Sequence, residues 1–421
     1  MRSRRGSGRA AAALAIAVAL VVAGCSSEGG SSDDDATGPA DSSTSTTAAP
    51  ASDPFVRDVV ATLAGDELEG RDDGTPGSVA AQDFLVDQLQ AIGAEPVSGS
   101  AQGATDAFRQ TFANGTNVLG VIPGGDLADE YVVVGAHYDH LGHDCDGVTA
   151  EDDICNGATD NAAGVAAALA VGQALAEGDE APRRSVILAF WDREEDDFAG
   201  SLQFLADPPV PLDDVVGYVN FDIQGANLSP SLKDVTVMVG AETGGPNLEA
   251  AATEAADGSE LTTLDLSLLF GQGRSDHAVF ADAGIPVVFF TDANAPCYHT
   301  TGDELEIVDF DKLDRQIGTA LRLTQELATT DDVPEYTPDT PAATFEDAES
   351  MLAILRQAEP DFGRFSADDE AASQQFLTDL TAIVDAGPDA FDDAAVGTLL
   401  EGSVGIVSAL STGECDGFLD G

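Results

Sequence analysis

Five side chains that could bind a metal ion follow one another along the chain: His137, Asp160, Glu195, Asp222 and His299. A further carboxylate, Glu194, stands directly before the third of them. Two divalent cations held close together need about this set, with one imidazole and one terminal carboxylate for each cation and one carboxylate between them. Such cations polarise a scissile carbonyl group and lower the pKa of bound water, and a carboxylate that is not a ligand can carry the proton. These residues therefore predict hydrolysis.

Most of these residues come after an apolar run that predicts a strand. The runs are residues 131–136 before His137, 186–191 before the glutamate pair, 216–221 before Asp222 and 285–290 ahead of His299. Continuous apolar runs of this length indicate strands buried on both faces, as in a sheet covered by helices. Because the carboxyl ends of strands form the ligand crevice of an open α/β sheet, four strand ends can converge on one site.

Helical segments lie between these runs. Residues 161–176 are rich in Ala and Leu and follow Asp160 directly, which places that carboxylate at a helix start. Nearer the N-terminus, two amphipathic helices are expected around residues 55–63 and 79–92, and residues 117–122 predict an early strand. The alternation of strand and helix predicts an α/β architecture.

Six sequence blocks carry a resemblance to a known family. They are HYDHLG (137–142), GATDNAAG (157–164), REEDDFAGS (193–201), NFDIQG (220–225), SDHAVF (275–280) and CYHTTGDE (297–304). Together and in this order they resemble the bacterial di-zinc aminopeptidases of metallopeptidase family twenty-eight, over about residues 54–329. The resemblance implies a mixed, largely parallel sheet flanked by helices, like that of zinc exopeptidases, and release of N-terminal residues from peptides. One departure is Asp197, where members often have Gly.

The same resemblance assigns the metal ligands. It implies two Zn²⁺ per chain, one held by His137, Asp160 and Asp222 and the other by Asp160, Glu195 and His299. The carboxylate of Asp160 bridges the two ions. Imidazole and carboxylate ligands suit zinc, although cobalt and manganese can also occupy such sites.

Three further residues receive roles from the resemblance. Glu194 matches the general base, which takes a proton from water and passes it to the leaving amine. Tyr298 matches a position whose hydroxyl group helps to stabilise the tetrahedral intermediate in some members. Asp139 matches a carboxylate that orients the ligand imidazole, a common arrangement for metal-bound histidine.

Non-functional roles compete with these assignments. An acidic pair such as Glu194 and Glu195 is usually a solvated surface feature, but its position directly after an apolar run favours the site. The chain has only five histidines, and we interpret His140 and His143 as structural residues.

The block SDHAVF also lies near the active site in the family. Its Asp276 and His277 either support the ligands or are purely structural.

The N-terminus predicts export. Four arginines precede the apolar segment 10–22, which is long enough for a signal-peptide core but too short to span a membrane. The segment ends in VAGC, which resembles a bacterial lipobox whose Cys25 is lipidated; the alternative is an ordinary secretory signal with an incidental cysteine. We therefore expect a signal peptide at 1–24, a disordered tether of small and polar residues at 25–53, and a lipid anchor at the outer face of the cell membrane.

Charge and cysteines fit an exported protein. The formal net charge of -59 opposes binding to nucleic acid and to anionic membrane surfaces, and it favours solubility. Beyond Cys25 four cysteines remain, an even number that suggests two disulfides in an oxidising compartment. Because Cys145 and Cys155 bracket the loop between His137 and Asp160, we expect them to pair, which leaves Cys297 with Cys415. Metal ligation by cysteine is the alternative, but the spacings lack a CxxC pair.

A domain boundary is expected at residues 329–341, where three prolines break the helical periodicity of the apolar residues. It separates a catalytic domain at 54–329 from an acidic C-terminal region at 330–421. Apolar residues recur there at helical spacing, which predicts about three helices in residues 345–410 packed on the catalytic domain.

Three other functions compete with a peptidase acting on peptides with a free N-terminus. A glutaminyl cyclase-like protein shares much of the fold and zinc site but catalyses intramolecular aminoacyl transfer, and a catalytically silent surface ectodomain typically loses ligands. The presence of both histidines and all three ligand carboxylates favours hydrolysis. A carboxypeptidase would need basic residues for a substrate carboxylate, and Arg274 is the only arginine beside a site motif apart from Arg193 inside one.

Overall fold

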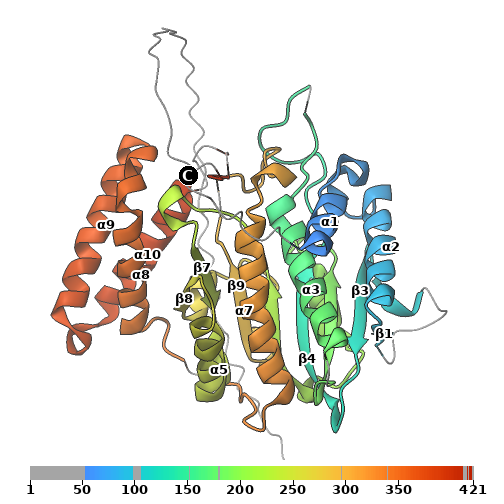
Figure 1. Cartoon of the computed structure of the whole chain (residues 1–421). Coiled ribbons are helices and arrows are strands. Elements are labelled where there is room, and N and C mark those ends of the chain that lie inside the picture. Colours follow the sequence, from blue (N-terminus) through green and yellow to red (C-terminus); the bar gives the residue numbers. More distant parts are fainter. Residues whose placement is uncertain are drawn as a thin grey trace, which may run out of the picture. The chain divides into compact units, whose positions relative to one another are not determined.

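One mixed β-sheet organises the part of the chain that the computed structural model describes (Figure 1). The described residues are 53–97, 106–150, 152–178, 181–294, 296–338, 340–410, 415 and 417–419. They belong to a single unit, Pro50–Gly421. The expected signal peptide, Cys25 and all but the last residue of the expected tether lie outside them.

The strands are β1 Glu95–Pro96, β2 Arg109–Phe112, β3 Gly115–Ile122, β4 Leu127–His137, β5 Arg184–Trp191, β6 Val215–Phe221, β7 Val235–Val239, β8 Thr262–Leu266 and β9 Val287–Thr291. Their order across the sheet is β1-β3-β5-β4-β6-β9-β7-β8, and β2 pairs with β3. The central strands β5, β4, β6 and β9 are parallel, whereas β3 joins β5 and β7 joins β9 in antiparallel pairing. The expected mixed, largely parallel sheet is confirmed.

The helices are α1 Pro54–Leu63, α2 Pro76–Ala91, α3 Ala163–Glu177, α4 Ala199–Ala206, α5 Gly245–Asp257, α6 His277–Asp282, α7 Phe310–Thr329, α8 Phe345–Ala358, α9 Ala367–Ala386 and α10 Asp393–Leu410. The helices expected near the N-terminus and in residues 345–410 therefore form.

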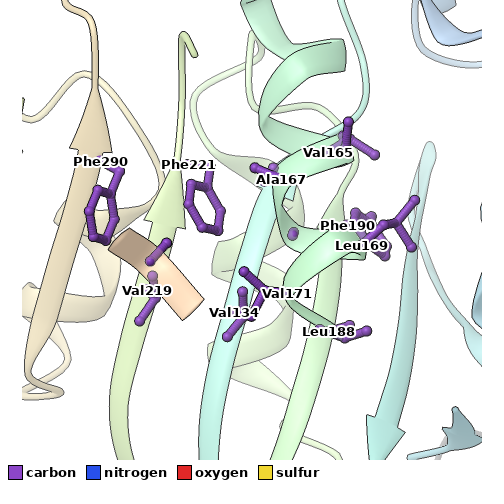
Figure 2. Packing of buried hydrophobic residues seen from close by; sticks show 14 of the residues in the cluster. Val134, Val165, Ala167, Leu169, Val171, Leu188, Phe190, Val219, Phe221 and Phe290 are labelled. Atoms are coloured by element: carbon purple, nitrogen blue, oxygen red, sulfur yellow. The ribbon is translucent and has the colours of Figure 1, made fainter. Parts of the chain in front are cut away.

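Both faces of the sheet are buried, because successive strand residues point to opposite sides. Val132 and Val134 of β4 pack in a core with α1, α2, α3, α5 and α7, where Val165 and Leu169 of α3 lie over the strands (Figure 2). Val133 faces the other way, into a core that includes residues of α4 and α6. This two-sided burial explains why the central strands read as continuous apolar runs.

The C-terminal helices share a core with the edge strands β7 and β8. Leu264 and Leu266 of β8 lie in one cluster with residues of all three helices, among them Leu355, Leu380 and Leu399. Figure 1 shows α8, α9 and α10 beside this edge of the sheet. By length and composition alone, α10 could cross a membrane. In the described part of the chain it packs in this bundle, with 22% of its residues buried. The C-terminal region therefore packs on the edge of the sheet through this shared core.

Candidate metal centre

The parallel strands bring the predicted ligands to one edge of the sheet. His137 is the last residue of β4, and Asp222 directly follows β6. Glu195 lies in the turn after β5, and His299 lies in the loop after β9. Asp160 comes from the irregular turn Ala158–Ala162 that precedes α3. The convergence expected from strand ends is therefore present.

The contacts among these side chains form two groups joined by one carboxylate. Nε2 of His137 lies 3.3 Å from Oδ1 of Asp160 and 3.3 Å from Oδ1 of Asp222. Nε2 of His299 lies 3.3 Å from Oδ2 of Asp160 and 3.3 Å from Oε2 of Glu195. The two oxygens of Asp160 thus face different histidines, as a bridging carboxylate requires.

These separations suit metal ions better than direct hydrogen bonds. An N–H···O bond is commonly about 2.9 to 3.0 Å long. A tetrahedral ion with ligand bonds of about 2.0 Å holds its ligands roughly 3.3 Å apart, and imidazole nitrogen with carboxylate oxygen is a usual zinc donor set. The residues present therefore fit two zinc ions.

The carboxylates of the cluster stabilise a positive charge placed among them. Burial opposes protonation of His299, yet its contacts with Asp160 and Glu195 outweigh burial and raise its pKa to about 10. Burial and the charge of Asp160 raise the pKa of Glu195, but contacts with His140 and His299 outweigh them and lower it to about 2. Several buried carboxylates this close together need a compensating cation.

Glu194 is buried beside the cluster, so the interpretation as a solvated acidic pair is wrong. It is 8% exposed, and a carboxylate oxygen lies within 4.8 Å of ligand atoms of His137 and Asp222. Burial raises the pKa of Glu194 well above the ordinary value, and the charges of nearby carboxylates add to this effect. The charge of His137 opposes it but is outweighed. A carboxylate with a raised pKa can accept a proton near neutral pH.

Asp139 positions both the histidine and the glutamate pair. Nδ1 of His137 lies 3.1 Å from the backbone oxygen of Asp139 and 3.5 Å from its carboxylate. The carboxylate accepts hydrogen bonds from the backbone N–H groups of Glu194 at 3.1 Å and Glu195 at 3.3 Å. The backbone oxygen is therefore the nearer partner of the imidazole, and the carboxylate mainly fixes the turn after β5.

The turn that carries Asp160 depends on a residue that the sequence analysis missed. The buried carboxylate of Asp303 accepts hydrogen bonds from the backbone N–H groups of Thr159 at 2.8 Å and Asp160 at 3.0 Å. Asn161 donates to the backbone oxygen of Phe221 at 2.8 Å. These bonds hold the backbone out of helical geometry, so α3 begins at Ala163 and not at Asn161 as expected. Asp303 lies in the block CYHTTGDE, and this position in a family-like block was the sequence feature that could have identified it.

Gly157 is required at the start of this turn. Its φ is +56°, in the left-handed region that glycine adopts at low cost. A Cβ atom there would lie 2.1 Å from the backbone oxygen of Asp160 and 2.6 Å from the ring of His140. The block GATDN therefore needs its glycine for close packing beneath the bridging carboxylate.

Arg71 is a second residue that the sequence analysis missed. It is fully buried, and its guanidinium donates to the backbone oxygens of Tyr138 at 2.8 Å, Asn156 at 2.7 Å and Gly157 at 3.1 Å, and to that of Leu63. Burial lowers its pKa to about 10 against the nearby carboxylates. It joins the loop after His137 to the loop before Asp160.

His140 was interpreted as structural, but it lies at the site. Its Nδ1 is 2.9 Å from Oε1 of Glu195, and its ring is edge-on to that of His299 with 5.7 Å between centroids. In contrast, His143 is exposed and contacts the backbone oxygen of Asp153 at 2.5 Å. Spacing alone did not separate the two, because only the tertiary structure brings Glu195 to His140.

The SDHAVF block lies behind the site. Ser201 donates a hydrogen bond to the buried carboxylate of Asp276 at 2.5 Å, and burial raises the pKa of that carboxyl group to about 7. His277 stacks on Phe289 with 4.1 Å between ring centroids, and burial lowers its pKa to about 3. His277 therefore packs as a neutral ring.

Tyr298 lines a cavity together with several predicted ligands, among them Glu195 and His299. Its ring stacks on His299 with 3.8 Å between centroids, and its hydroxyl lies 3.5 Å from Nη2 of Arg274. Burial, with the charges of Asp160 and Glu195, raises the pKa of its hydroxyl group far above the ordinary value. The phenol therefore stays protonated and can donate a hydrogen bond.

Several non-glycine residues around the site adopt left-handed backbone conformations. Ile223, next to Asp222, has φ 60°, and His299 has φ 56°. Asp197, where family members often have Gly, also has φ 60°. Such conformations are uncommon outside glycine and gather at functional sites.

Both expected disulfides are present. Cys145 pairs with Cys155 in the loop between β4 and the Asp160 turn, and Cys297 pairs with Cys415 beyond α10. The second disulfide joins the end of the C-terminal region to the residue directly before Tyr298.

A mixed sheet with imidazoles and carboxylates gathered at the carboxyl edge of its parallel strands defines an α/β protein of the metallopeptidase class. Residues 117–324 match Peptidase family M28. This match covers just under half of the chain, from β3 into α7.

The curated relative leupeptin-inactivating enzyme 1 of Streptomyces exfoliatus is 25% identical over 325 residues, which are 68% of this chain and 65% of that protein. This chain therefore spans just under two thirds of that relative's length.

Solved structures show the same fold. BSAP, a zinc aminopeptidase from Bacillus subtilis, aligns with a TM-score of 0.52 and 13% identity over 68% of this chain and 98% of its own. A glutaminyl cyclase from Porphyromonas gingivalis aligns with a TM-score of 0.50 and 21% identity over 64% of this chain and 98% of its own. Because an aminopeptidase and a cyclase share it, the fold alone does not define the reaction.

Proposed function

We propose that this chain is a zinc-dependent aminopeptidase that hydrolyses the first peptide bond of peptides with a free N-terminus. The observation that carries the proposal is the placement of the Asp160 carboxylate between two histidines. Each of its oxygens lies 3.3 Å from Nε2 of a different histidine. Two complete sets of donors suit two zinc ions, one held by His137, Asp160 and Asp222, the other by Asp160, Glu195 and His299. The match of residues 117–324 to Peptidase family M28 and the similar fold of a zinc aminopeptidase support the choice of metal.

When bound, the zinc pair would polarise the scissile carbonyl group and lower the pKa of a water molecule. Glu194 would act as the general base, since it is buried beside the cluster and has a raised pKa. It takes the proton from the attacking water and gives it to the leaving amine. Asp139 keeps this carboxylate in place through the backbone of the turn.

Tyr298 would donate a hydrogen bond to the oxyanion that develops at the carbonyl group. Its raised hydroxyl pKa keeps the proton available, and its position among the residues lining the cavity supports contact with substrate. Preorganised donors of this kind commonly contribute about 10²- to 10³-fold to turnover.

A matched pair of variants tests the division of roles between adjacent glutamates. Glu194→Gln should keep two zinc ions per chain and lose roughly two to four orders of magnitude in turnover. Glu195→Gln should instead lose zinc, as measured by elemental analysis of dialysed protein. Full activity in Glu194→Gln would show that another group moves the proton.

A panel of peptides tests the reaction itself. The wild-type protein should release the first residue from a leucyl peptide, and a chelator or a blocked α-amine should stop release. A cyclase would convert an N-terminal glutaminyl peptide to a pyroglutamyl product without shortening it, and a silent ectodomain would do neither. Cyclisation without residue release would replace the aminopeptidase proposal.

We further propose export and lipid anchoring at Cys25. The VAGC sequence after an apolar segment supports this, and the two disulfides fit an oxidising compartment. Radioactive palmitate should label the wild-type protein in the bacterial membrane fraction, and Cys25→Ala should abolish the label. A labelled Cys25→Ala protein would contradict the anchor.

A further inference from the structure

A cavity of about 170 Å³ adjoins the metal centre and extends to the C-terminal helices. One part of its wall is formed by Glu194, Glu195, Tyr298 and His299. Another part comes from the three helices, and its lining residues include Leu355, Phe376, Ile406, Val407 and Leu410. Residues of the C-terminal helices, which all follow the last predicted ligand in sequence, therefore share one cavity with the predicted ligands.

The contacts between the helices and the sheet are specific. The buried carboxylate of Asp347 on α8 accepts hydrogen bonds from the backbone N–H of Ser267 at 2.8 Å and from its hydroxyl at 2.7 Å. Asp361, after α8, accepts from the backbone N–H of Ser231 at 2.8 Å. Together with the shared apolar core and the Cys297–Cys415 disulfide, these bonds fix the helices against β7 and β8. The wall is therefore a built part of the site.

The lining of this wall is apolar. Val237, Val239, Leu264 and Leu266 from β7 and β8 face the same cavity as the aliphatic residues of the helices. Among the described lining residues, Arg274 is the only arginine, and it lies beside Tyr298. A dry apolar cavity of about 150 Å³ holds a benzene ring in another protein. The cavity here therefore has the size and chemistry for one large aliphatic or aromatic side chain.

The helical part of the wall lies outside the region that matches the family. The match ends at residue 324, and α8 begins at Phe345. This part of the wall is therefore formed by residues that follow the region matched by the family.

We infer that α8, α9 and α10 determine substrate specificity. They complete a pocket that receives the side chain of the substrate's N-terminal residue and selects large apolar residues such as Leu and Phe. This inference rests on the proposed aminopeptidase function. Burial of the three additional carbon atoms of Leu relative to Ala corresponds to about 60-fold in kcat/KM. The full-length enzyme should show a preference of this order.

Two positions on α10 offer a matched test. Val407 lines the cavity, whereas Val404, one turn earlier, is 51% exposed and is not among the lining residues. Val407→Phe should lower kcat/KM for a leucyl chromogenic substrate by at least tenfold and leave the alanyl substrate within about twofold. Val404→Phe should leave both values unchanged, and both variants should retain the zinc content and circular dichroism spectrum of the wild type.

A variant that enlarges the pocket gives the opposite test. Ile406 also lines the cavity and is only partly buried, so Ile406→Ala should fold and should shift the preference from leucyl toward tryptophanyl substrates. An unchanged Leu to Ala ratio in both Val407→Phe and Ile406→Ala, with an active wild type, would overturn the inference and leave the aminopeptidase proposal intact. A zinc-loaded wild type that released no residue from any substrate would overturn both.

Discussion

Removal of the Cys297–Cys415 disulfide should weaken the protein more than removal of the Cys145–Cys155 disulfide. The cysteines of the first pair are separated by 118 residues and those of the second by 10. In the chain-entropy description, a cross-link stabilises by restricting the unfolded chain, and its effect grows with the logarithm of the closed loop. This gives about 4.9 kcal/mol for the long loop and about 2.7 kcal/mol for the short one at 25 °C.

The double variants Cys297→Ser/Cys415→Ser and Cys145→Ser/Cys155→Ser test this difference without leaving a free thiol. Urea unfolding of zinc-loaded proteins, at equal protein and zinc concentrations, measures the free energy of unfolding of each. The long-loop variant should lose about 2 kcal/mol more than the short-loop variant. It should also lose part of its preference for leucyl substrates, because Cys415, beyond α10, is no longer joined to the residue before Tyr298.

Two results would refute this reasoning. Equal losses in the two double variants would show that restriction of the unfolded chain does not govern these disulfides. A destabilised long-loop variant with unchanged leucyl preference would show that the disulfide does not hold the wall of the cavity.

Three further predictions concern single residues. Asp160→Ala should leave well under two zinc ions per chain and no activity, and two tightly bound zinc ions in the folded variant would contradict the bridge. His140→Ala should weaken zinc binding by about 10- to 100-fold in chelator competition, since partners of metal ligands commonly have effects of this size, and unchanged affinity would limit His140 to packing. His277 has a folded pKa of about 3, below its ordinary value of 6.5, so it contributes stability above pH 6.5 that is lost as the pH falls toward 3. Between pH 6.5 and 5 the wild type should lose about 1.6 kcal/mol relative to His277→Phe in denaturant unfolding, and parallel pH profiles would mean that the ring is protonated in the folded protein.

The sequence by itself determined the central strands and the identity of the clustered site residues. The apolar runs before His137 and Asp222 are continuous because both faces of these strands are buried. Each predicted ligand lies at or near the end of such a strand or in a short block of recognisable composition. Local pattern, together with the resemblance of six blocks to a known family, therefore selected these side chains from 76 acidic residues and five histidines.

Only the tertiary structure decided which residues support the predicted ligands. Arg71 and Asp303 act through backbone groups of segments far from them in sequence, and His140 meets Glu195 only because β4 and β5 are neighbours. Contacts of this kind depend on strand order and loop path, which leave no periodic signal along the chain.

The same holds for the wall of the cavity. Apolar spacing predicted helices in residues 345–410, but it did not predict that they would lie against β7 and β8. An apolar helix face can be buried against any complementary surface, because the hydrophobic effect has no direction. The packing of the whole chain, with the Cys297–Cys415 disulfide, places that face beside the metal centre.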